Sequence, residues 1–82
     1  MRVVVLTTGG DYGAAVTHLR RGADLAPRNA DAHRNLGLAL ALTGRLDEGI
    51  AEAREAVRLQ PASPDAQQTL AQLLTARSAP RR

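Results

Sequence analysis

The sequence of 82 residues contains no cysteine, tryptophan or phenylalanine, and Tyr12 is its only aromatic residue. The lack of cysteine excludes disulfide frameworks, thiol nucleophiles and cysteine-containing zinc sites. A chain this short also buries only about 60% of the surface that its unfolded form exposes, which leaves little room for a deep catalytic pocket. We therefore expect a single small domain that is not an enzyme and carries no cofactor.

Most of the chain carries equal numbers of basic and acidic residues. Eleven basic residues face eight acidic ones, for a net charge of +3, but three of the basic residues are Arg77, Arg81 and Arg82 at the C-terminal end. Nucleic-acid binders typically carry a stripe of cations, with aromatic side chains for base stacking. We therefore expect no nucleic-acid partner.

The N-terminal segment has no long apolar run. Residues 3–6 are its only consecutive apolar side chains after the start, and Thr7 follows them. A signal-peptide core needs roughly 7 to 15 apolar residues and a membrane span needs about 20. We therefore expect a soluble, cytoplasmic protein without a membrane partner.

The chain does contain an internal repeat with a period of 34 residues. A fixed period of this size is typical of solenoids, in which each unit buries its apolar face against the next. The pairs that match after a shift of one period are Gly10 with Gly44, Leu25 with Leu59, Pro27 with Pro61, Asp31 with Asp65, Leu36 with Leu70 and Leu40 with Leu74.

Within one period the pattern predicts two helices. Asn29 is a suitable N-cap for the first, and Gly44 ends it. The second begins near Asp47 and is stopped by Pro61, which lacks an amide hydrogen. A third helix begins after Ser63, with proline at its first position. We expect a partial repeat over residues 1–29, a complete repeat over 30–63, a terminal helix over 64–76 and a flexible basic tail over 77–82.

The leucines of the first predicted helix alternate with alanine and glycine, which is formally the pattern of a strand. Leucine and alanine are strong helix formers and no β-branched residue interrupts the run, so we predict a helix. On a helix, Leu36 and Leu40 face the partner helix, whereas Leu38 and Leu42 project from the other side.

These features resemble the tetratricopeptide repeat (TPR) family, whose unit of two antiparallel helices follows the pattern W-x2-L-G-x2-Y, then A-x3-F, then P. The corresponding residues here are His33, Leu36, Gly37, Leu40, Gly49, Ala53 and Pro61. The resemblance implies an all-α solenoid with one complete repeat between partial repeats. It also implies a non-enzymatic scaffold module that binds another protein or a peptide.

The sequence departs from the family pattern mainly in the size of the side chains at the aromatic places. The three large aromatic places are taken by His33, Leu40 and Ala53, so the helices should sit closer together and the domain should be only marginally stable. Gly37 would allow this close approach and so offset its cost in helix propensity of about 1 kcal/mol. Gly49 would likewise allow the two helices to approach closely.

The resemblance places partner binding on the concave face, which the first helices of successive units form. Leu38 and Leu42 would give it an apolar strip with Arg34 at the edge, suited to a peptide with leucine-like anchors and an acidic group. In the alternative, both leucines simply pack against neighbouring helices. The expected surface comprises Asp31, Arg34, Asn35, Leu38, Ala41, Leu42, Gln68, Gln72 and Thr75.

Some family members hold a C-terminal carboxylate on this face with Lys, Arg and Asn side chains. Arg34 and Asn35 could contribute to such a clamp, but Asp65 and Thr69 stand where further cations would be expected. His18 and His33 lie on different predicted helices without a supporting cluster, so we expect no metal site.

Three further alternatives stay open in the sequence. Glu52 could form an acid–base pair with Glu48 or Glu55, although a solvated outer face is the simpler interpretation. Residues 3–13 could form a phosphate-binding strand, loop and helix, although their spacing does not match that motif. The chain could also form a homodimer that covers Val3 and Val5, or be part of a longer array.

Overall fold

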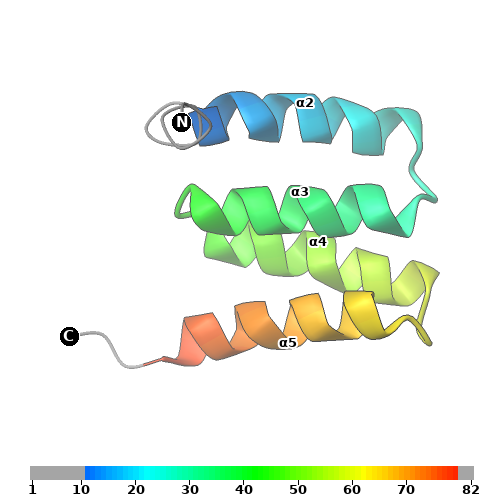
Figure 1. The fold of residues 1–82 in the computed structure, drawn as a ribbon, viewed down its shortest axis with the longest axis vertical. Helices are drawn as coiled ribbons and strands as arrows, with labels where there is room; N and C mark the ends of the chain where they lie inside the picture. The colour runs from blue at the N-terminus through cyan, green and yellow to red at the C-terminus, as the bar shows by residue number, and fades with distance from the viewer. Residues whose placement is uncertain (1–10, 80–82) are drawn as a thin grey trace, which may run out of the picture.

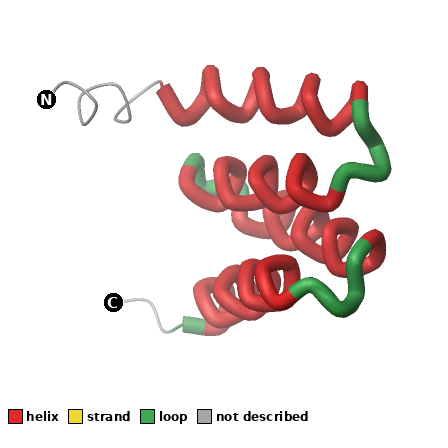
Figure 2. Tube along the Cα trace, turned by 45° about the vertical axis from the view of Figure 1, so that its right-hand side comes forward, coloured by secondary structure: helices red, strands yellow, loops and turns green. Residues whose placement is uncertain are grey.

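The computed structural model describes residues 11–79, which form four α-helices. They are α2 (Asp11–Leu25), α3 (Ala30–Leu42), α4 (Leu46–Leu59) and α5 (Pro64–Ser78). Consecutive helices run antiparallel and are joined by short turns (Figure 1). Within residues 11–79 there is no strand, as the all-α prediction requires (Figure 2). The strand proposed near the N-terminus and the valines of the proposed dimer contact lie outside the described residues.

The two predicted N-caps are confirmed. The Asn29 side chain accepts a hydrogen bond from the amide of Ala32 at 3.1 Å, at the start of α3. The Ser63 hydroxyl accepts one from the amide of Ala66 at 3.3 Å, and Pro64 occupies the first turn of α5. Each cap satisfies a helix amide that would otherwise lack an intrahelical partner.

Gly44 ends α3 as predicted, by adopting a left-handed backbone conformation with φ of +88°. This conformation lets the Gly44 amide donate to the carbonyl of Ala41 at 3.1 Å and the Arg45 amide donate to that of Leu40 at 2.8 Å. The two bonds form a Schellman motif, which satisfies the last carbonyls of the helix and reverses the chain. Because of this turn, α4 runs antiparallel to α3 and packs against it.

The C-terminal helix is longer than the sequence analysis predicted. It ends at Ser78 instead of residue 76, so the first part of the expected flexible tail is helical. Neither glycine nor proline interrupts residues 65–79, and Ala79, which precedes Pro80, is extended with ψ of 142°. A following proline disfavours the helical conformation, which explains the later end. Arg77 is consequently helical, and its Nη1 lies 3.6 Å from Oδ1 of Asp47 on α4.

The core consists of small clusters between successive helices. Leu36 and Leu40 are buried, with at most 1% of their surface exposed, as expected for the inward face of α3. The cluster they belong to reaches α2 through Val16 and Ala23. Two further clusters join α4 to its neighbours, one built on Ala30, Ala56 and Ala66 and one on Ile50, Ala53 and Leu73.

The close approach of α3 and α4 at their glycines is also confirmed. A methyl group placed on Gly37 would lie 2.7 Å from the carbonyl oxygen of Gly49 and 3.3 Å from the amide nitrogen of Ala53. Such short distances to backbone atoms cannot be relieved by turning a side chain. The absence of a side chain is therefore a condition for this packing.

Candidate partner-binding surface

The predicted surface lies on α3 and α5, the first helices of the two successive units. These two helices contact each other directly, and α4 lies behind α3 in the view of Figure 1. Leu38 and Ala41 of α3 belong to the same apolar cluster as Leu70, Leu73 and Leu74 of α5. The structure thus brings the residues predicted on α3 next to those predicted on α5.

The two leucines of the predicted apolar strip have different environments. Leu38 is half-buried in the cluster between α3, α4 and α5, so the alternative interpretation as a packing residue holds for it. Leu42, by contrast, is 61% exposed at the end of α3. Ala41 is half-buried beside Leu38. The apolar part of the surface is therefore narrower than expected and centres on Leu42.

Arg34 lies two helical turns before Leu42 on α3. Its side chain is 25% exposed, and its Nη2 lies 3.7 Å from Oδ1 of Asp31. Its buried Nε has no hydrogen-bond partner among the described residues. A single ion pair with a largely exposed carboxylate contributes little to stability. The Nη groups of Arg34 therefore remain available to an acidic group, and the exposed Asn35 follows Arg34 in the sequence.

The residues predicted on α5 supply exposed polar groups. Gln68, Gln72 and Thr75 are all exposed. Thr69, one of the positions considered for a carboxylate clamp, is only 5% exposed and therefore cannot reach a ligand. The surface thus combines one cation, one exposed leucine and a row of amides and a hydroxyl that can hydrogen-bond to a polypeptide backbone.

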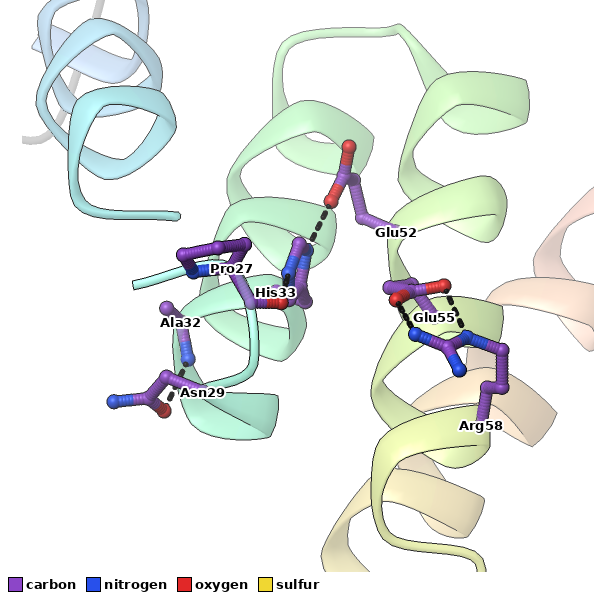
Figure 3. A network of polar contacts seen from close by, with 7 residues as sticks. All are labelled: Pro27, Asn29, Ala32, His33, Glu52, Glu55 and Arg58. Carbon is purple, nitrogen blue, oxygen red and sulfur yellow. Dashed lines mark hydrogen bonds and ion pairs between the residues drawn. The ribbon is translucent and has the colours of Figure 1, made fainter. Parts of the chain in front are cut away.

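A histidine contact that the sequence analysis missed connects α3 to α4 (Figure 3). The His33 Nδ1 lies 2.8 Å from Oε1 of Glu52, and its Nε2 lies 2.8 Å from the carbonyl oxygen of Pro27. Burial lowers the pKa of His33, but the hydrogen bonds to Glu52 and Pro27 outweigh it and raise the pKa above the ordinary value of 6.5. The sequence signal was the histidine in an aromatic place that faces the second helix of the unit.

The other glutamates do not form the acid–base pair that was considered. The Glu55 carboxylate accepts a hydrogen bond from Nε of Arg58 at 2.9 Å, which lowers the pKa of Glu55 and raises that of Arg58. Glu48 lies 3.6 Å from Arg45. Each glutamate considered therefore has a basic partner instead of a second carboxylate.

A groove lined by other residues lies outside the predicted surface. It has a volume of about 620 Å³ and lies between α2 and the turn from α3 to α4. Arginines dominate its charge, and its walls are Gly13, Val16, Thr17, Arg20, Arg21, Asp24, Thr43 and Arg45. The adjacent Arg20 and Arg21 were the only sequence signal for it.

Neither a metal cluster nor a membrane span occurs in the part of the chain that the structure describes. No group of three histidine, aspartate or glutamate side chains comes together there to hold a metal ion. None of the helices within residues 11–79 is long and apolar enough to cross a membrane.

Comparison with known proteins identifies the family. The family model described as tetratricopeptide repeat matches residues 5–64, most of the chain. The chain belongs to the tetratricopeptide repeat family. TPR repeats are generally protein–protein interaction modules, and the family is typically non-enzymatic.

One relative with a similar TPR segment is the TPR repeat-containing thioredoxin TTL4 of Arabidopsis thaliana. It is 39% identical over 69 residues, which cover 84% of this chain and 10% of that protein. The chain therefore spans about a tenth of the length of this relative.

Proposed function

We propose that this TPR chain is a non-enzymatic interaction module that holds a peptide or protein segment on the surface formed by α3 and α5. The observation that carries the proposal is the 61% exposure of Leu42 on the helix that also carries Arg34. Burying an exposed leucine against a partner is worth about 1–2 kcal/mol, so the free protein leaves binding energy available at this point.

The chemistry of the surface defines the partner that would fit. An apolar anchor would cover Leu42, and an acidic group about two helical turns away would meet the Arg34 guanidinium. The exposed amides of Gln68 and Gln72 on α5 would hydrogen-bond to the backbone of an extended segment. We therefore propose a peptide with a leucine-like residue and a carboxylate, and no cofactor.

The proposal also covers activity, location and assembly. The side chains on this surface donate and accept hydrogen bonds but include no activated nucleophile, so we propose that the protein binds its partner in the cytoplasm without catalysing a reaction.

Self-association is the alternative, and light scattering over a concentration series tests it. A mass that rises with concentration would favour the dimer over the peptide-binding module.

Selection of peptides from a random displayed library tests the proposal, because it does not require the natural partner to be identified first. The affinity of a selected peptide is then measured for the unmodified chain and for Arg34→Glu. We expect this substitution to weaken binding at least tenfold, or about 1.4 kcal/mol, because it replaces attraction of an acidic group by repulsion. Arg54→Glu, at an exposed arginine of α4, is the matched control and should leave the affinity within about twofold.

Two results would overturn the proposal. The first is that no peptide is selected although the chain is folded. The second is that Arg34→Glu binds normally while Arg20→Glu abolishes binding, which would transfer the function to the arginine-lined groove beside α2.

A further inference from the structure

His33 occupies a position between two segments that are far apart in sequence. Its ring reaches Glu52 on α4 with one nitrogen and the Pro27 carbonyl, in the turn between α2 and α3, with the other (Figure 3). Both distances are 2.8 Å, and 13% of the His33 side chain is exposed. The ring therefore ties the turn that carries α2 to the hairpin of α3 and α4.

The protonation state of the ring decides whether both contacts can exist. A carboxylate oxygen and a carbonyl oxygen only accept hydrogen bonds, so each needs an N–H group from the ring. A neutral imidazole has a single N–H, whereas the imidazolium has two. Loss of the proton therefore turns one of the two contacts into an approach of a nitrogen lone pair to an oxygen.

We propose that His33 acts as a pH-sensitive clasp, which holds the turn between α2 and α3 against α4 while the ring is protonated and releases one contact when the proton is lost. This device regulates the packing of α2 and goes beyond the proposed peptide binding. Partner binding is not required for it.

The charges around the ring favour the protonated form. Glu52 and Glu55, both on α4, stabilise the positively charged ring. The Glu55 carboxylate also accepts a hydrogen bond from Arg58. From the turn, the carbonyl oxygen of Pro27 lies 2.8 Å from the ring, and Arg28 in the same turn is exposed. On α3 itself, Asp31 and Arg34 lie next to each other at 3.7 Å and form an ion pair.

The segment released by the clasp has few other attachments. Among the described residues, α2 contributes the buried Val16 and Ala23 to the core cluster between α2 and α3, with Leu19 partly buried beside them. The turn at residues 26–29 leads directly from α2 into α3. Loosening this turn should therefore increase the opening of α2, while α4 remains packed between α3 and α5.

The first test is an NMR titration of the His33 ring in the unmodified chain and in Glu52→Gln. We expect the unmodified ring to lose its proton above the ordinary histidine value of 6.5, and Glu52→Gln to shift the His33 titration downward. A His33 ring that titrates at or below the ordinary value, or that ignores Glu52→Gln, would overturn the clasp.

The second test measures amide hydrogen exchange from about pH 6 to about pH 8, corrected for the intrinsic pH dependence of exchange. In the unmodified chain, protection of α2 and residues 26–29 should fall as the pH rises, relative to α4. His33→Trp places the aromatic residue of the TPR pattern at this position and cannot titrate, so its relative protection should stay constant. Identical pH profiles for the two proteins would show that His33 is only a structural contact.

Discussion

Gly37 of α3 and Gly49 of α4 pack backbone against backbone. A methyl group on Gly49 would lie 2.6 Å from the Gly37 carbonyl oxygen and 3.2 Å from the amide nitrogen of Ala41, and a methyl group on Gly37 would meet Gly49 in the same way. Neither position can carry a side chain unless the helices separate. The reciprocity explains why the two helices of the complete repeat can pack with small residues in the large aromatic places.

Gly37→Ala should destabilise the protein. Overpacking typically costs about 1–3 kcal/mol, which exceeds the gain of about 1 kcal/mol in helix propensity. Gly22→Ala is the matched control, because Gly22 is also helical and nothing lies within 4 Å of the added methyl group. We expect urea unfolding to show a loss of stability for the first substitution and a gain for the second. If Gly37→Ala and Gly22→Ala both increased the stability, α3 and α4 could move apart to make room for a methyl group, which would contradict the tight packing at Gly37.

Leu40→Ala should have a far larger effect than Leu42→Ala. Leu40 is fully buried, whereas Leu42 is 61% exposed at the end of the same helix. Truncating a buried leucine costs about 2–5 kcal/mol, which is a large part of the stability of a chain this short. Circular dichroism during urea unfolding should therefore show an unfolded or strongly weakened Leu40→Ala and a nearly unchanged Leu42→Ala. Equal midpoints would contradict the orientation of α3.

Ser63→Ala should weaken the start of α5. The lost side chain is the acceptor for the amide of Ala66, and removal of an N-cap costs about 1 kcal/mol. Ser63→Asp keeps an acceptor at the same position and should stay close to the unmodified chain. Thermal melting followed by helicity measures the difference. If both variants melted at the same lowered temperature, the hydrogen bond would not be the source of the stabilisation.

His33 should make the stability of the protein depend on pH. Its pKa in the folded state is raised above the ordinary value of 6.5, so its contribution is complete below that pH and is lost as the pH rises through the folded pKa. Urea unfolding at a series of pH values should show this decline for the unmodified chain and a flatter profile for His33→Gln. His18→Gln, at an exposed histidine, should keep the decline.

Much of the fold was predictable from the sequence because its signals are local. Asn29, Gly44 and Ser63 define helix ends through contacts with residues at most four positions away. The repeat period and the four-residue spacing of the buried Leu36 and Leu40 then indicate which helices pair. The family comparison confirms the TPR assignment that these features predicted.

The candidate surface was less predictable because exposure depends on neighbouring helices. Leu38 and Leu42 were predicted to share one face of α3, yet Leu38 packs into the cluster between α4 and α5, whereas Leu42 is 61% exposed. The contact between His33 and Glu52 joins residues 19 positions apart, so it required the packing of α3 on α4. The end of α5 at Ser78, by contrast, has a local signal in Pro80, which the sequence analysis did not use.

The most direct test of partner binding by α3 and α5 compares Leu42→Asp with Leu25→Asp. Both leucines are exposed, at 61% and 79%, but Leu25 ends α2 outside the proposed surface. Affinity for a library-selected peptide should fall at least tenfold, about 1.4 kcal/mol, for Leu42→Asp and remain unchanged for Leu25→Asp. Equal affinities for the two variants, with both folded, would contradict the account.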